Sequence, residues 1–159
     1  MTRILSAVLV LACLVLAACG SSGPVRRVSE PAASIQQLTV RADGSWSVDL
    51  RINNYSTVPM RFDAVRLAVT VGGEAAGTLQ GTPAITIGPE SADVATLQIS
   101  PAAGARVRIA DALASRHSVA YTFSGTITAA PSDGGGARDY DLERSSALSP
   151  VPGLPGVLR

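Results

Sequence analysis

The sequence is short of the residues from which catalytic and metal sites are usually built. Its 159 residues include one histidine, two cysteines, six aromatic residues (one Trp, three Tyr, two Phe) and no lysine, since all thirteen basic residues are arginine. A Ser-His-Asp triad would depend on His117, and no Gly-x-Ser-x-Gly nucleophile motif is present. One histidine and two cysteines near the N-terminus cannot close a four-ligand zinc site. We therefore predict no enzymatic activity, no cofactor and no metal, and we place His117 at a helix end, where its partial charge suits the helix dipole.

Basic residues do not cluster, which argues against a nucleic-acid partner. The formal net charge is +1, and the densest basic groups are Arg26-Arg27 and the pair Arg106 and Arg108. Proteins that bind the phosphate backbone concentrate many cations on one surface, because each neutralised phosphate adds to affinity. We therefore expect no nucleic acid among the partners.

The N-terminus has the pattern of an export signal. Met1-Thr2-Arg3 supplies a positive charge, residues 4–15 are apolar apart from Ser6, and small residues follow. Export signals have this order of charge, apolar core and small-residue exit. The apolar stretch is shorter than the roughly 20 residues that a membrane-spanning helix needs. We therefore predict a signal peptide over residues 1–18.

The end of this signal, Leu16-Ala17-Ala18-Cys19, resembles a bacterial lipobox. The resemblance implies that the Cys19 thiol receives a diacylglycerol and that the chain is cut before it. Anchoring is then stable, because each buried methylene contributes about 0.8 kcal/mol and more than one acyl chain is attached. Residue 20 is Gly rather than the Asp that retains Gram-negative lipoproteins at the inner membrane, so the resemblance implies the outer membrane, facing the periplasm. Cys19 is the one site residue that we predict, and membrane lipid is its partner.

The mature chain that this prediction leaves is small and neutral. Removing residues 1–18 leaves 141 residues and removes Arg3, so 12 basic residues balance 12 acidic ones. Residues 19–33 are rich in Gly, Ser and Pro and are predicted to form a flexible tether. Residues 149–159 contain three prolines, which remove backbone donors and fix φ, so this tail is predicted to lack regular structure. One domain over residues 34–148, without a possible disulfide, remains.

Apolar and polar residues alternate through most of this domain. A period of two is typical of strands with one face on a core and the other in water. The predicted inward residues are Trp46, Val48, Leu50 and Ile52; Val65, Leu67, Val69 and Val71; Ala95, Leu97 and Ile99; and Val119, Tyr121, Phe123, Gly125 and Ile127. At such a position Trp46 is expected to belong to the core rather than to stack on a ligand.

Turn residues separate these runs and indicate the fold class. Asp43-Gly44 predicts a two-residue hairpin turn. Residues 104–117 place apolar side chains at helical spacing and predict one short helix, with Ile109, Ala110, Leu113 and Ala114 on its apolar face. We predict an all-β fold: an antiparallel β-sandwich of the immunoglobulin or fibronectin III type, with seven or eight strands and one short helix, preceded by the lipoprotein signal peptide.

Two polar patterns have both a structural and a functional interpretation. Asp139, Asp141 and Glu143 alternate on one strand face, where their oxygens would either bind Ca²⁺ or, more simply, discourage pairing at a sheet edge. Asn54-Tyr55-Ser56 matches the N-glycosylation triplet. In a bacterial lipoprotein, Asn53 and Asn54 are better explained as turn residues that bond local backbone and tolerate positive φ.

The order of several motifs resembles a known family. A strand ending in Ile52-Asn53-Asn54 precedes Pro59-Met60, a long strand ends at Gly72-Gly73, and Gly77-Thr78-Leu79 and Tyr121-Thr122-Phe123-Ser124-Gly125 follow. This order resembles the group 2 late embryogenesis abundant (LEA) proteins, whose module is also called the water stress and hypersensitive response (WHy) domain. The resemblance covers roughly residues 34–148. The family's proline between the two asparagines is missing here.

The resemblance implies a sandwich with one helix and a non-enzymatic role in tolerance of desiccation or other stress. Bacterial members of the family are often exported or lipid-anchored, as the N-terminus predicts here. We expect a lipid-anchored protein of the bacterial cell envelope that acts by contact with protein or membrane surfaces. The alternative is a structural or assembly partner that docks to an envelope complex by β-strand addition.

Overall fold

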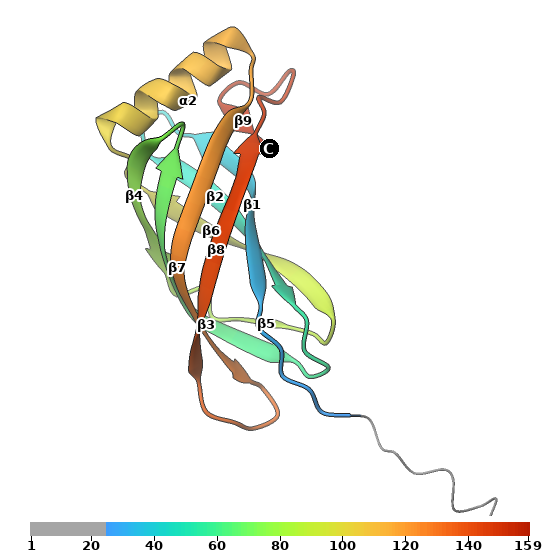
Figure 1. The fold of residues 1–159 in the computed structure, drawn as a ribbon. Coiled ribbons are helices and arrows are strands. Elements are labelled where there is room, and N and C mark those ends of the chain that lie inside the picture. The colour runs from blue at the N-terminus through green and yellow to red at the C-terminus, as the bar shows by residue number, and fades with distance from the viewer. Residues whose placement is uncertain (1–24) are drawn as a thin grey trace, which may run out of the picture.

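Two antiparallel β-sheets pack face to face, and one helix lies across one end of them (Figure 1). The computed structural model describes residues 25–159, so the predicted signal peptide and Cys19 lie outside the described residues. The elements are β1 (Ala32–Val40), β2 (Trp46–Asn54), β3 (Met60–Val71), β4 (Glu74–Gly81), β5 (Ile85–Ile87), β6 (Ser91–Ile99), α2 (Ala103–Ser115), β7 (Val119–Pro131), β8 (Arg138–Leu148) and β9 (Val157–Leu158). The predicted all-β antiparallel sandwich with one short helix is confirmed. Within residues 25–159, no helix is both long and apolar enough to span a bilayer.

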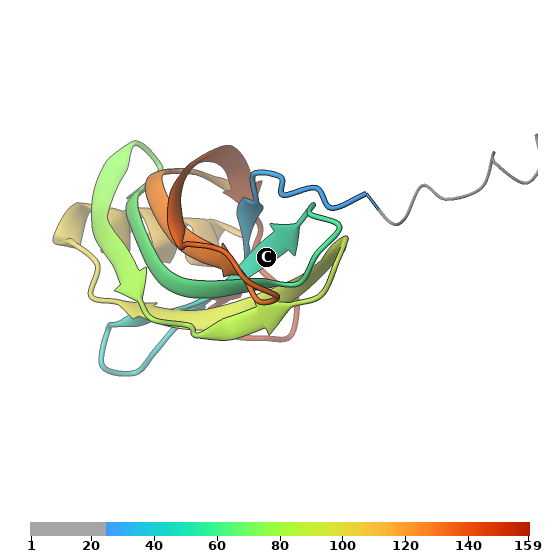
Figure 2. The same ribbon diagram turned by 90° about the horizontal axis from the view of Figure 1, so that it is seen from below.

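Each sheet combines hairpins with longer-range pairs. The smaller sheet has the strand order β6-β2-β1-β9, and the larger has the order β4-β3-β7-β8, with β5 also pairing with β3. All these pairs are antiparallel. The view from below shows the larger sheet curling over the smaller one (Figure 2). The strands run lengthwise between two ends, one with α2 and the other with the β7–β8 hairpin (Figure 1).

The predicted inward faces form the core between the sheets. The predicted inward residues of the four alternating runs are buried, except for Gly125, which is half-buried. Trp46 is 1% exposed, which confirms its place in the core. Tyr121 and Phe123 stack with ring centroids 6.2 Å apart. The Tyr121 hydroxyl accepts a hydrogen bond of 3.1 Å from the Ile35 backbone N–H, at the bulge in β1, and so ties the two sheets together.

The helix is present, but its buried face differs from the prediction. Ala105, Ile109 and Ala112 are buried, whereas Ala110 and Ala114 are exposed. The spacing of apolar residues was ambiguous because alanine is common on both faces of a helix. The helix ends at Arg116, which adopts the left-handed conformation (φ 54°, ψ 37°) and donates its backbone N–H to the Ala112 carbonyl.

The predicted ends of the domain are wrong on both sides. β1 begins at Ala32, inside the predicted tether, and residues 25–31 are hydrogen-bonded to the β2–β3 connection. In the predicted unstructured tail, β9 pairs with β1, and Leu158 is completely buried. The three prolines lie in the connection before β9, where they leave its ladder bonds intact.

The predicted two-residue turn at Asp43-Gly44 is also wrong. Residues 41–45 connect β1 to β2, the Arg41 N–H donates to the Ser45 carbonyl over 2.9 Å, and Gly44 has φ 82°. In longer hairpin loops, a residue with positive φ commonly follows the turn. Gly44 occupies that position, rather than the second position of a two-residue turn.

Candidate functional site

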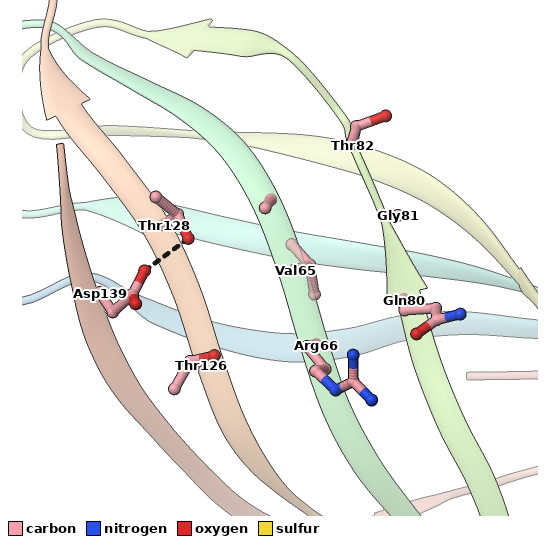
Figure 3. A pocket seen from close by; sticks show the side chains of 9 residues that line it. Val65, Arg66, Gln80, Gly81, Thr82, Thr126, Thr128 and Asp139 are labelled. Carbon is pink, nitrogen blue, oxygen red and sulfur yellow. Dashed lines mark hydrogen bonds between the residues drawn. The ribbon is translucent and has the colours of Figure 1, made fainter.

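A shallow cavity lies on the outer face of the larger sheet, where four strands meet (Figure 3). Its volume is about 530 Å³. The residues that line it are Ala64, Val65, Arg66, Gln80, Gly81, Thr82, Thr126, Thr128 and Asp139. They come from β3, β4, β7 and β8 and from the residue after β4, so sheet pairing itself positions them.

The charged groups of this cavity lie on opposite sides of it. Arg66 extends toward Gln80 on β4, whereas Asp139 lies beside Thr128 on β7 (Figure 3). The Thr128 hydroxyl donates a hydrogen bond of 2.6 Å to the Asp139 carboxylate. The polar side chains of this cavity are those of Arg66, Gln80, Thr82, Thr126, Thr128 and Asp139. Its chemistry is that of a hydrogen-bonding surface.

Gly125 brings the two central strands of this face together. Gly125 has φ 154°, and a Cβ atom there would overlap the backbone carbonyl of Arg66 on β3. Only glycine permits this close approach of β7 to β3. The outer face beside it carries the short side chains Thr122, Ser124, Thr126 and Thr128, at alternate positions of β7.

The acidic residues predicted on one face of β8 are found there. Asp139, Asp141 and Glu143 are exposed and lie opposite Thr128, Thr126 and Ser124 of β7. Across residues 25–159, no three Asp, Glu, His or Cys side chains are grouped so that they could hold a metal ion. The three carboxylate side chains lie on a solvent-exposed strand face.

His117 follows the residue that caps α2. Its Nε2 atom lies 3.7 Å from the Asp111 carboxylate, and about half of its side chain is exposed. Its backbone N–H donates to the Ala112 carbonyl over 3.2 Å. The contacts of His117 are those of a helix end, as the sequence predicts.

A second cavity lies between α2 and the segment that leads to β9. Its volume is about 960 Å³, and its lining is mostly apolar. The residues are Ala110, Leu113, Ala114 and Arg116 of the helix end, with the continuous segment Pro150, Val151, Pro152, Gly153, Leu154, Pro155 and Gly156. Ala110, Leu113 and Ala114, which the sequence predicts on the apolar face of the helix, line this cavity.

A buried polar cluster, which sequence reasoning missed, closes the opposite end of the sandwich. Asn54 and Ser56 are the two buried polar residues of the described chain, at 1% and 0% exposure. The Asn54 amide nitrogen donates to the carbonyls of Val58 (2.9 Å), Ile87 (3.1 Å) and Gly88 (2.8 Å). Its Oδ1 atom accepts the Ser56 backbone N–H over 2.9 Å. One side chain thus joins the ends of β2, β3 and β5.

This cluster decides between the two interpretations of the Asn54-Tyr55-Ser56 triplet. Asn54 does bond local backbone, as predicted, and its amide is enclosed, so it cannot carry a glycan in this fold. The predicted turn conformation is wrong, because Asn53 and Asn54 both belong to β2 and neither has positive φ. Asn53 pairs with Ala32 on one side and Ala92 on the other, as an ordinary strand residue.

The β1–β2 turn contains an ionisable group whose protonation affects stability. Ser45 donates its hydroxyl (2.6 Å) and its backbone N–H (2.9 Å) to the Asp43 carboxylate. These bonds, the hydroxyl first, lower the pKa of Asp43 below its ordinary value of 3.8.

The pH dependence of this turn is a small but specific prediction. Because the folded pKa of Asp43 is lowered, its contribution to stability is present above pH 3.8 and is lost as pH falls through the folded value. In Asp43→Asn, we expect the free energy of unfolding to fall less steeply below pH 3.8 than in the parent. Urea unfolding at pH 2, 3, 4 and 6 measures this, and parallel curves for the two proteins would contradict it.

Comparison with known proteins identifies the fold but no family. No family model matches the sequence, and none of the curated proteins matches it. The solution structure of AT1g01470 from Arabidopsis thaliana is similar, with a TM-score of 0.50 and 8% identity, covering 82% of this chain and 87% of that one. A crystal structure of a protein from Archaeoglobus fulgidus has a TM-score of 0.46 and 13% identity, covering 79% of this chain and 98% of that one. At 8% identity, the likeness to the Arabidopsis thaliana structure concerns the fold alone.

Proposed function

We propose that this protein is a lipid-anchored, non-enzymatic protein of the bacterial cell envelope that protects other molecules during desiccation or related stress. Acylated Cys19 holds it on the outer membrane, facing the periplasm. The proposal takes its anchor from the Leu16-Ala17-Ala18-Cys19 motif and its role from the resemblance to the LEA group 2 (WHy) family. The domain acts through its surface and uses no cofactor.

The observation that supports this proposal is the outer face of the larger sheet. Short hydroxyl side chains repeat along β7, at Thr122, Ser124, Thr126 and Thr128, and Arg66, Gln80 and Asp139 flank them. A hydroxyl both donates and accepts hydrogen bonds, so such a face offers a client surface the same two kinds of bond as water does. The side chains are held by the sheet, which lowers the entropic cost of making those bonds.

The experiment dries a labile enzyme with the purified domain and compares its recovered activity with that of the enzyme dried with an inert protein of the same size. Residues 25–159 are the segment to use, because β1 begins at Ala32 and β9 ends at Leu158. We expect several-fold more activity with the domain. The matched variant Thr122→Val/Ser124→Ala/Thr126→Val keeps the strand shape but removes the hydroxyls, and we expect it to protect less. Equal losses with the domain and with the inert protein would contradict the proposal.

One observation favours the alternative, an assembly partner that docks by strand addition. β8 ends the strand order of the larger sheet, and among the strands of residues 25–159 its 11 residues pair with β7 alone. The charged residues of β8, between Arg138 and Arg144, discourage unspecific pairing with other strands. A partner strand of complementary charge could still add to this edge. Cross-linking from β8 to one stoichiometric envelope protein, together with no protection on drying, would favour this alternative.

A further inference from the structure

The N-terminal segment 25–31 is fixed to one end of the sandwich. The backbone N–H of Thr57 donates to the Arg27 carbonyl over 3.0 Å, and the Arg27 N–H donates to the Thr57 hydroxyl over 2.9 Å. That hydroxyl donates in turn to the Val25 carbonyl over 2.7 Å. Further along, the Ser29 N–H donates to the hydroxyl of Ser56, over 3.0 Å, within the buried cluster. The segment therefore follows the β2–β3 connection closely.

Two arginine side chains extend these contacts to the neighbouring loops. Arg26 pairs with Asp133 over 2.9 Å and donates to the Gly134 carbonyl over 2.6 Å, both in the β7–β8 connection. Arg27 pairs with Glu90, in the connection before β6, over 3.3 Å. Exposed ion pairs contribute little singly. Here they add to the backbone bonds, so that residues 25–31 contact three connections at the same end.

These contacts shorten the free connection to the predicted anchor. Five residues, 20–24, separate Cys19 from Val25. Fully extended, that connection spans about 20 Å, whereas one reaching from Cys19 to the start of β1 would span about 45 Å. The end of the sandwich that holds residues 25–31 must then stay within about 20 Å of the acylated residue.

We propose that this end, formed by residues 25–31 and the connections 55–59, 88–90 and 132–137, faces the phospholipid headgroups. The α2 end and its apolar cavity then point away from the bilayer (Figure 1). This inference rests on the proposed acylation of Cys19. The partner is the headgroup surface of the membrane that holds the lipid.

The chemistry of this end suits a headgroup surface. Val25 (75% exposed), Val28 (40%) and Tyr55 (51%) are large apolar side chains exposed there. The amphipathic ring of tyrosine fits the region between water and acyl chains. Val107 and Leu154 are also exposed, at the α2 end, so exposure alone does not choose between the ends. The short connection to Cys19 does.

The test measures the distance of each end from the membrane in the full lipoprotein. The protein is reconstituted in vesicles of phosphatidylethanolamine and phosphatidylglycerol. Single cysteines replace Gly136, where a Cβ meets nothing within 4 Å, or Val107 on α2. Each introduced cysteine is labelled with a donor dye, and we measure the efficiency of energy transfer from this dye to acceptor dyes on the lipid headgroups. The 13 residues of β7 separate the ends by about 43 Å, so we expect transfer at least about threefold greater from position 136 than from position 107.

A variant of the segment tests whether its contacts set this orientation. Arg26→Ala/Arg27→Ala/Thr57→Ala removes both ion pairs and the Thr57 hydroxyl bonds. We expect the difference between the two positions to fall to less than half. The matched control Arg61→Ala/Asp63→Ala removes an exposed ion pair of 2.6 Å within β3 that does not contact the segment, and we expect it to keep the difference.

The outcomes separate this inference from the function on which it rests. Acylated, vesicle-bound protein with equal transfer from both positions overturns the orientation and leaves the anchor intact. An unaltered difference in the segment variant overturns the role of residues 25–31. Protein that is neither acylated nor bound to vesicles overturns the proposed anchor, and the orientation with it.

Discussion

Asn54→Asp is expected to cost at least about 4 kcal/mol of the free energy of unfolding, a large part of the 5–15 kcal/mol that a domain of this size has. The substitution keeps the size of the side chain but removes its N–H groups. Three backbone carbonyls, at Val58, Ile87 and Gly88, then lose a donor. Each buried polar group without a partner costs roughly 1–3 kcal/mol, and a buried carboxylate facing carbonyl oxygens adds repulsion.

Urea unfolding of the two proteins checks this expectation, with Asn53→Asp as the matched control. Asn53 is the preceding residue of β2 and points to the opposite, half-buried face, so we expect its substitution to change stability by less than about 1 kcal/mol. The cost of Asn54→Asp should also be smaller at pH 4 than at pH 8. Burial raises the pKa of the introduced carboxyl, and its neutral form, favoured at low pH, avoids the buried charge. Equal costs at positions 53 and 54 would contradict the role of the Asn54 amide.

The fold could be predicted from the sequence because buried and exposed residues alternate every two positions along a strand, so the pattern is visible within a few residues. The alternation in Trp46, Val48, Leu50 and Ile52 depends only on which face of one strand is covered, and the structure covers that face. Conformations that depend on a distant partner could not be predicted. β9 is two residues long and exists because it pairs with β1 more than a hundred residues earlier. Nothing in the local composition around Val157 and Leu158 indicates that pairing.

The buried cluster shows the same limit for the candidate sites. The residue type of Asn54 suggested a local turn, because asparagine most often bonds backbone within a few residues. Two of its three carbonyl partners, Ile87 and Gly88, lie 33 and 34 residues away in sequence. Only the tertiary fold, which places the end of β2 beside the end of β5, brings them together. The available sequence signal was that Asn54 stands two residues after Ile52, in step with the inward positions of the alternation.

Cys19→Ala is expected to abolish acylation completely and to leave the signal peptide uncleaved. The diacylglycerol is attached through the thiol, and alanine has no nucleophile to accept it. Two measurements check this: incorporation of labelled fatty acid and the mass of the N-terminal peptide. The parent should begin at residue 19, and the variant at residue 1 or 2.

The matched control is Cys13→Ala, the other cysteine of the chain, which lies within the predicted apolar stretch of the signal. We expect Cys13→Ala to be acylated and processed like the parent, because alanine preserves both the length and the apolar character of that stretch. Fatty acid on Cys19→Ala at the level of the parent would show that the lipobox interpretation is wrong. Loss of labelling in both variants would instead mean that the apolar stretch itself was disturbed. A loss of labelling confined to Cys19→Ala would show that the lipid is attached through the Cys19 sulfur. That residue lies six positions before Val25, where the fixed segment begins.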